Sequence, residues 1–109
     1  MIEKTYAFST QPDKKIEKIV DDDNLIINHM VLPQGESLPE HFSNSNVYLV
    51  IVSGQMILTL DEQNAHRYTR GEIVNIPYHT KMNITNADED VLEFFVVKAP
   101  NPKDYKEQS

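Results

Sequence analysis

Among the four histidines of this chain, His41 is the candidate for acid–base chemistry. His41 stands two residues before Ser43, and on an extended segment this spacing places both side chains on one face. An imidazole titrates near neutral pH, so His41 in a pocket could act as a general base. A buried, hydrogen-bonded histidine without a catalytic role is the alternative interpretation of the same residue.

Composition removes several other classes of site. The chain has no cysteine, which excludes disulfides, thiolate zinc sites and thiol nucleophiles. A net charge of −7, with scattered lysines and arginines, argues against a nucleic-acid partner. No apolar run approaches the roughly 20 residues that a bilayer requires, and the first residues do not resemble a secretion signal. We therefore expect a cytoplasmic protein that binds neither nucleic acid nor membranes.

Short apolar runs separated by turn residues predict an all-β chain with a single domain. With 109 residues, the chain can build one core. We expect a core barrel over about 15–98, an N-terminal strand segment over 1–14 and a loosely packed tail over 99–109. The strands are predicted at 15–20, 25–32, 47–52, 55–60, 66–68, 73–77, 82–85 and 91–97.

One strand is apolar on both faces. The six residues 47–52 are all apolar, which predicts that both faces of this strand are covered. If Val47 faces the interior, Tyr48 points to the opposite layer. A face made by this strand and the pair Phe94 and Phe95 would be exposed in a lone barrel, so we expect a homodimer.

Two spaced motifs carry a family resemblance. The first is Gly35-x5-His41-x-Ser43-x3-Val47-x6-Gly54, and the second is Gly71-x5-Pro77-x-His79-x2-Met82-x3-Asn86. They resemble the two motifs of the cupin superfamily. The resemblance implies a cupin-type double-stranded β-helix, also described as a jelly-roll β-barrel.

The same resemblance implies four metal-binding positions, and this chain departs from the pattern at three of them. His41 is retained, whereas the other positions hold Ser43, Val47 and Met82. Valine offers no donor, serine is a weak ligand, and methionine suits soft metals only. We therefore expect neither the usual metal nor any other cofactor.

A rearranged metal site is an alternative. His79 lies three residues before Met82, and a turn could bring its ring toward His41. His41, His79 and Met82 would then suit copper or, with water, zinc. The competing interpretation is a solvent-facing His79 in a loop.

The resemblance also predicts a ligand pocket inside the barrel. We expect a cupin of unassigned role that binds a small molecule there without metal. The alternatives are an enzyme of the isomerase or lyase type that uses His41, and a metal-dependent cupin with the rearranged site. His29 has no carboxylate at ligand spacing and is expected to be structural. The predicted pocket residues are His41, Ser43, Val47, Leu49, Tyr78 and Met82.

Overall fold

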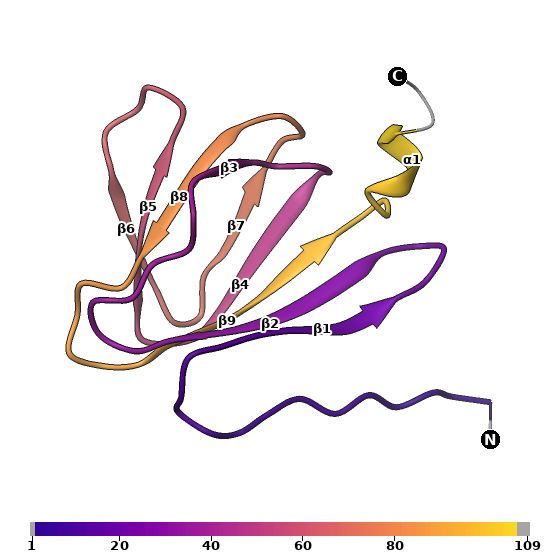
Figure 1. The fold of residues 1–109 in the computed structure, drawn as a ribbon, viewed down its shortest axis with the longest axis horizontal. Coiled ribbons are helices and arrows are strands. Elements are labelled where there is room, and N and C mark those ends of the chain that lie inside the picture. The colour runs from indigo at the N-terminus through magenta and orange to yellow at the C-terminus, as the bar shows by residue number, and fades with distance from the viewer. Residues whose placement is uncertain (1, 107–109) are drawn as a thin grey trace.

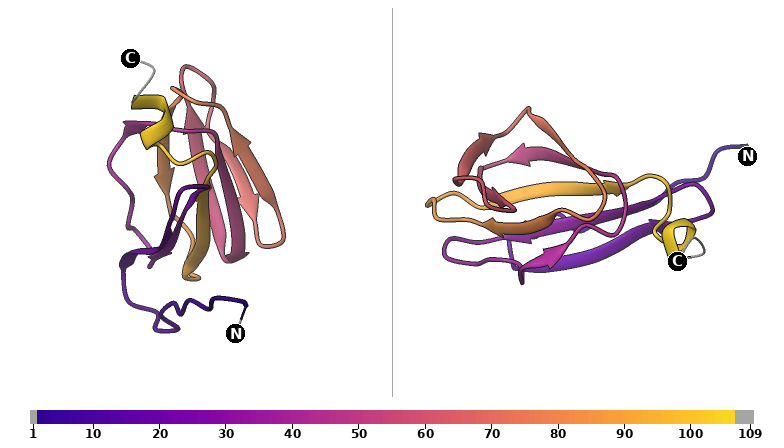
Figure 2. Two further views of the ribbon diagram at one scale, coloured as in Figure 1. Left: turned by 90° about the vertical axis from the view of Figure 1, so that its right-hand side faces the viewer. Right: turned by 90° about the horizontal axis from the view of Figure 1, so that it is seen from above.

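Two antiparallel β-sheets form the body of the protein, as seen in a computed structural model that describes residues 2–106 (Figures 1 and 2). One sheet has five strands in the order β1-β2-β9-β4-β7, and the other has four in the order β3-β8-β5-β6. The strands are β1 (Lys15–Asp21), β2 (Ile26–Leu32), β3 (His41–Phe42), β4 (Val47–Ser53), β5 (Gln55–Leu60), β6 (His66–Thr69), β7 (Ile73–Ile76), β8 (Lys81–Thr85) and β9 (Leu92–Lys98).

The core lies between the two sheets. Alternate residues of each strand point inward, and along β4 the buried Val47, Leu49 and Ile51 alternate with the more exposed Tyr48, Val50 and Val52. This burial of apolar side chains drives the sheets together. The inward-facing residues include Met30, Leu32, Val47, Leu49, Ile51, Met56, Leu58, Ile76, Met82, Ile84, Leu92 and Phe94.

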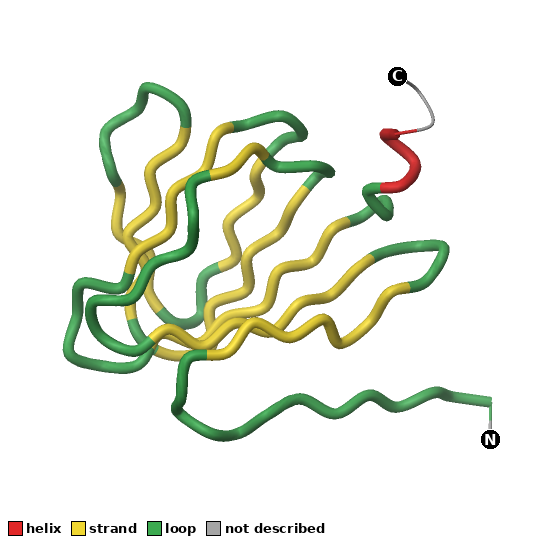
Figure 3. Tube along the Cα trace, in the orientation of Figure 1, coloured by secondary structure: helices red, strands yellow, loops and turns green. Residues whose placement is uncertain are grey.

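All eight predicted strands are confirmed, and the nine observed strands lie between residues 15 and 98 (Figure 3). The strand that the sequence did not predict is β3. It has two residues, His41 and Phe42, which pair with Met82 and Lys81 of β8. Two residues are too short to show a period of two, so no local pattern could reveal this strand.

The N-terminal segment differs from its prediction. Residues 2–14 contain no strand and form an extended arm beside β1 and β2 (Figure 1). The ring centroid of Phe8 lies 4.9 Å from those of His29 and Phe95, on the outer face of the five-stranded sheet. Because the arm lies over a sheet face rather than along an edge, it cannot make the ladder of hydrogen bonds that defines a strand.

The C-terminal tail is docked rather than loose. Asn101 is buried and donates hydrogen bonds from Nδ2 to Asp21 Oδ1 at 3.0 Å and to the Asp22 carbonyl at 2.7 Å. The short helix α1 (Lys103–Lys106) follows, while the end of the predicted tail, residues 107–109, lies outside the described residues. Within residues 2–106, no helix is long and apolar enough to cross a membrane.

Gly54 occupies the tightest of the glycine turns. Its φ is +78°, and a Cβ atom built there would lie 2.4 Å from the Val91 carbonyl oxygen. Gly35 has a similar φ of +84°, yet a Cβ there would meet nothing within 4 Å. The two positions therefore share a left-handed backbone conformation that favours glycine but differ in crowding.

Replacing Gly54 with alanine should destabilise the protein much more than replacing Gly35. A left-handed conformation costs a non-glycine residue about 1–3 kcal/mol, and Gly54→Ala adds a clash with backbone that cannot move freely. We expect a loss of about 3 kcal/mol or more for Gly54→Ala and about 1–2 kcal/mol for Gly35→Ala. Urea unfolding measures both, and equal losses would contradict the role assigned to crowding.

Candidate functional site

A pocket opens between the two sheets beside β3. Its empty volume is about 370 Å³, including space at the open mouth. One side comes from β2, β4 and β9, and the other from β3, β8 and the segments next to β3. The lining is mostly apolar with a few polar groups, as is usual for small-molecule sites. It consists of Asn28, Met30, Leu38, His41, Ser43, Asn44, Val47, Met82, Ile84, Val96 and Lys98.

Four of the six residues predicted for the pocket lie along it, namely His41, Ser43, Val47 and Met82. The pairing of β3 with β8 sets His41 directly opposite Met82. Val47 faces inward from the start of β4, on the opposing sheet. The strand register therefore brings these side chains together.

Leu49 and Tyr78 require correction, because neither lines this pocket. Leu49 follows Val47 on the same face of β4, where it packs within the hydrophobic core beyond the pocket. Tyr78 is 47% exposed and stacks on Tyr105 of α1 with ring centroids 4.1 Å apart. The turn after Pro77 directs its ring outward to the C-terminal helix.

The structure does not bring His79 together with His41 and Met82. His79 has a φ of +63° and its ring stacks on Phe42, with centroids 4.9 Å apart. It lines a separate surface groove with Phe42, Tyr78 and Tyr105. Nowhere in residues 2–106 do three or more His, Asp or Glu side chains form a group that could hold a metal ion.

His41 stands at the mouth of the pocket and is exposed. Its Nδ1 atom lies 2.9 Å from the Pro39 carbonyl oxygen, which can only accept a hydrogen bond. The proton of the neutral ring is therefore assigned to Nδ1. This leaves a lone pair on Nε2, the state that a general base requires.

Ser43 is buried, and its hydroxyl both donates and accepts a hydrogen bond. The Oγ atom donates to the Pro77 carbonyl at 2.6 Å and accepts from the Thr80 N–H at 2.8 Å. The Ser43 N–H also donates to the Thr80 carbonyl, and the Ser43 carbonyl accepts from the His79 N–H. Ser43 therefore fixes the turn between β7 and β8, and its hydroxyl is not free to act on a ligand.

Asn28 and Lys98 are pocket residues that the sequence interpretation missed. Asn28 lies in phase with Ile26, Met30 and Leu32, whose side chains are buried. A polar residue within a series of inward-facing apolar residues is the sequence signal that could have indicated a pocket residue here. Lys98 occupies the last position of β9, in phase with the buried Val96, and its side chain is half-buried.

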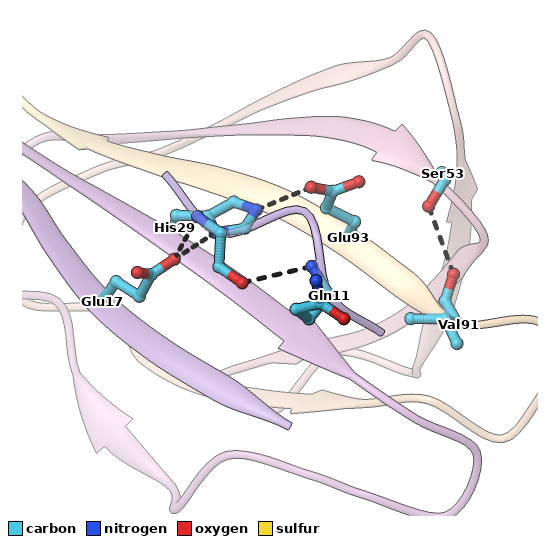
Figure 4. A network of polar contacts seen from close by, with 7 residues as sticks. Gln11, Glu17, His29, Ser53, Val91 and Glu93 are labelled. Atoms are coloured by element: carbon cyan, nitrogen blue, oxygen red, sulfur yellow. Dashed lines mark hydrogen bonds and ion pairs between the residues drawn. The ribbon is translucent and has the colours of Figure 1, made fainter. Parts of the chain in front are cut away.

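A second polar cluster lies on the outer face of the five-stranded sheet, away from the pocket (Figure 4). His29 is completely buried, with Nδ1 2.8 Å from Glu17 Oε1 and Nε2 2.7 Å from Glu93 Oε2. Glu17 Oε1 also accepts a hydrogen bond from the Ser9 N–H at 3.0 Å. We call Glu17, His29 and Glu93 the histidine clamp, because they join three strands and hold the N-terminal arm.

Two carboxylates contact His29, although none lies at ligand spacing along the chain, and these contacts agree with the structural role expected of it. Glu17 is directly opposite His29 across β1 and β2. Glu93 is opposite Val31 and thus diagonal to His29 across β2 and β9. Both carboxylates come from neighbouring strands, so spacing along the chain could not reveal them.

Residues 28–98 match the family model of the cupin domain, which covers well over half of the chain. The chain belongs to the cupin family. Its membership agrees with the two facing sheets and confirms the predicted double-stranded β-helix fold.

Relatives of this cupin include an uncharacterized protein of Methanocaldococcus jannaschii, which is 52% identical over 104 residues, 94% of this chain and 90% of the relative. The crystal structure of that protein, an RmlC-like cupin with a double-stranded β-helix fold, superposes with a TM-score of 0.94 at 50% identity. The match covers 97% of this chain and 98% of that one. The cupin domain of Schizosaccharomyces pombe Cnp3 has a TM-score of 0.77 at 15% identity, covering 94% and 75% of the chains, and shares the fold alone.

The residues at the four cupin metal positions do not fit the usual metal. His41 Nε2 is the one imidazole nitrogen available to a metal at these positions, and the Ser43 hydroxyl already donates one hydrogen bond and accepts another. Val47 has no donor, and Met82 offers only a soft thioether. What this cupin can bind therefore depends on the other groups in the pocket.

The histidine clamp should make stability depend on pH through Glu17. The hydrogen bond from His29, followed by that from the Ser9 N–H, lowers the pKa of Glu17 below its ordinary value of 4.5. A carboxylate with a lowered pKa stabilises the fold above its unfolded-state pKa, and this contribution is lost as the pH falls through the folded-state pKa. Glu17→Gln should thus reduce stability at pH 7 and have a smaller effect near pH 3.

Chemical unfolding at the two pH values measures this difference. Glu36→Gln is the matched control, because it removes a carboxylate from the exposed ion pair with Lys14, in which both side chains are more than 40% exposed. Such pairs contribute about 0–1 kcal/mol, so we expect little loss at either pH. An equal loss for Glu17→Gln at both pH values would show that the clamp acts only through packing.

Proposed function

We propose that this cupin binds a small molecule in the pocket beside His41 and does so without the usual cupin metal. The observation that carries this proposal is the pocket itself, which combines apolar walls with polar groups at its mouth and one end. Apolar walls supply affinity, and a few polar groups fix the orientation of a ligand. The engaged hydroxyl of Ser43, together with Val47 and Met82, supports metal-free binding.

An enzyme of the isomerase or lyase type is the second candidate. It is favoured by the contact of His41 Nδ1 with Pro39, which leaves Nε2 free to accept a proton from a molecule in the pocket. A cytoplasmic location stays a prediction of the sequence.

We further propose that two copies of the chain associate through the outer face of β4 and β7. Tyr48, Val52 and Ile73 are 40%, 43% and 65% exposed there, so one chain alone leaves this face of β4 uncovered. The proposed interface does not include Phe94 and Phe95, which were expected there. Phe94 is in the core, and the chain's own Phe8 packs against Phe95.

Methionine methyl signals offer a direct test of ligand binding. Met30 and Met82 line the pocket, whereas Met56 is buried in the core outside it and serves as an internal control. In a fragment library screened by NMR, binders should shift the methyls of Met30 and Met82 and leave Met56 in place. Binders that shift no pocket methyl, or a library without any binder, would contradict the proposal. Stoichiometric metal in the purified protein would contradict its metal-free part.

Ile73→Lys should weaken self-association. A charge at the centre of an apolar interface must be desolvated without a partner, which costs several kcal/mol. We expect sedimentation analysis to show a dimer for the natural sequence and a monomer for Ile73→Lys. Ile16→Lys is the control, because Ile16 is 57% exposed but lies on β1, at the other end of the sheet. A monomeric natural protein, or dissociation by both variants, would contradict the assigned face.

A further inference from the structure

Asn28 and Lys98 form a polar end of the pocket. The register of β2 and β9 pairs Asn28 with Val96 and Ile26 with Lys98, so Asn28 and Lys98 are diagonal neighbours. Diagonal residues on one sheet face are about 7–8 Å apart, within reach of a long side chain. Both side chains line the pocket. A ligand in the pocket therefore meets the amide and the ammonium close to each other.

Asn28 presents an acceptor that lacks a donor. Its Oδ1 atom is shielded from solvent and, alone among buried side-chain N and O atoms of the described residues, has no hydrogen-bond partner. Leaving a buried acceptor unsatisfied is costly, and most proteins avoid it. Because the Asn28 side chain lines the pocket, a small rotation of its amide opens Oδ1 to an O–H or N–H of a ligand.

Lys98 presents a cation that lacks a counterion. Within the described part of the chain, no carboxylate lies within 4.0 Å of its ammonium. Burial, and secondarily the charge of Lys18, lowers the pKa of Lys98. Lys18 itself pairs with Asp21 at 3.4 Å. This half-buried ammonium in the pocket wall is therefore the group with which an anion supplied by the ligand would pair.

We propose that the pocket takes a small organic acid with a short apolar body and a hydrogen-bond donor, such as a hydroxyl, next to its carboxylate. The carboxylate pairs with Lys98, the donor bonds to Asn28 Oδ1, and the apolar body lies among Met30, Val47 and Met82. An ammonium donor, as in an amino acid, is disfavoured because it would approach the two lysine charges. The inference rests on the proposed function and names its class of ligand.

Three related probes separate the parts of this proposal. They are 2-hydroxy-4-methylpentanoate, 4-methylpentanoate without the donor, and 2-hydroxy-4-methylpentanamide without the charge. The Met30 and Met82 methyl signals report their binding. A charge-assisted contact and a neutral hydrogen bond are each expected to contribute about tenfold in affinity. The hydroxy acid should therefore bind about tenfold more tightly than either comparator.

Lys98→Met tests the cation while keeping a long side chain. It should weaken binding of 2-hydroxy-4-methylpentanoate about tenfold and leave the amide nearly unchanged. Lys18→Met is the matched control, because it removes a neighbouring ammonium that does not line the pocket. It should affect the hydroxy acid by less than about threefold, since exposed charges are screened by solvent. Equal effects of the two variants would overturn the role of Lys98.

Asn28→Leu tests the acceptor with two readouts. It should abolish the preference for the hydroxy acid over 4-methylpentanoate. It should also raise the thermal midpoint of the ligand-free protein, because the unsatisfied oxygen is removed. A retained preference, or a lowered midpoint, would show that Oδ1 is not the recognition group.

The outcomes also distinguish this inference from the proposed function. If the amide binds as tightly as the hydroxy acid, the acid class is wrong while ligand binding in the pocket stands. If none of the three probes moves the Met30 and Met82 methyls but members of the fragment library do, the ligand class is again wrong and the proposed function stands. If the library fails as well, both are overturned.

Discussion

The need of every buried polar atom for a partner is the constraint on which the arrangement of this protein depends. Two facing sheets bury a continuous apolar core, and polar atoms at its boundary must be satisfied within the protein. Asn86 is completely buried and donates to the carbonyls of Leu32 and Asp90, which joins β2 to the turn before β9. His29 and Ser43 are buried and bonded in the same way. The polar residues of the interior are thus mainly connectors between elements.

The same constraint explains what became of the cupin metal positions. The Ser43 hydroxyl makes two hydrogen bonds to the turn between β7 and β8 and is therefore not available as a metal ligand. Val47 and Met82 add apolar surface to the pocket, and both are almost completely buried. A pocket without strong ligands has no need to hold charged groups at its centre. Its remaining recognition groups lie at the edges, where His41 and Lys98 keep contact with solvent.

Sequence alone could predict the strands and the family of this fold, because both depend on short-range patterns. The glycines that turn the chain and the apolar runs between them are visible in a few consecutive residues. The histidine clamp could not be foreseen, since His29 lies 12 and 64 residues from Glu17 and Glu93. The sequence likewise does not show that Val47 lines the pocket whereas Leu49 does not. Both residues face inward, and only the packing of the second sheet decides which of them meets the pocket.

Adjacent residues of β2 place a hydrogen-bonded polar side chain on one face of the sheet and an unsatisfied one on the other. On the outer face, His29 has both ring nitrogens bonded, whereas Asn28 on the inner face has an oxygen without a partner. A slip of one residue in the pairing of β2 would exchange these faces. The pairing with β1 already shifts between Lys18 and Val20, close to Asn28. Because the clamp bonds His29 to both neighbouring strands, it opposes such a slip. The satisfied histidine thereby keeps the unsatisfied asparagine directed into the pocket.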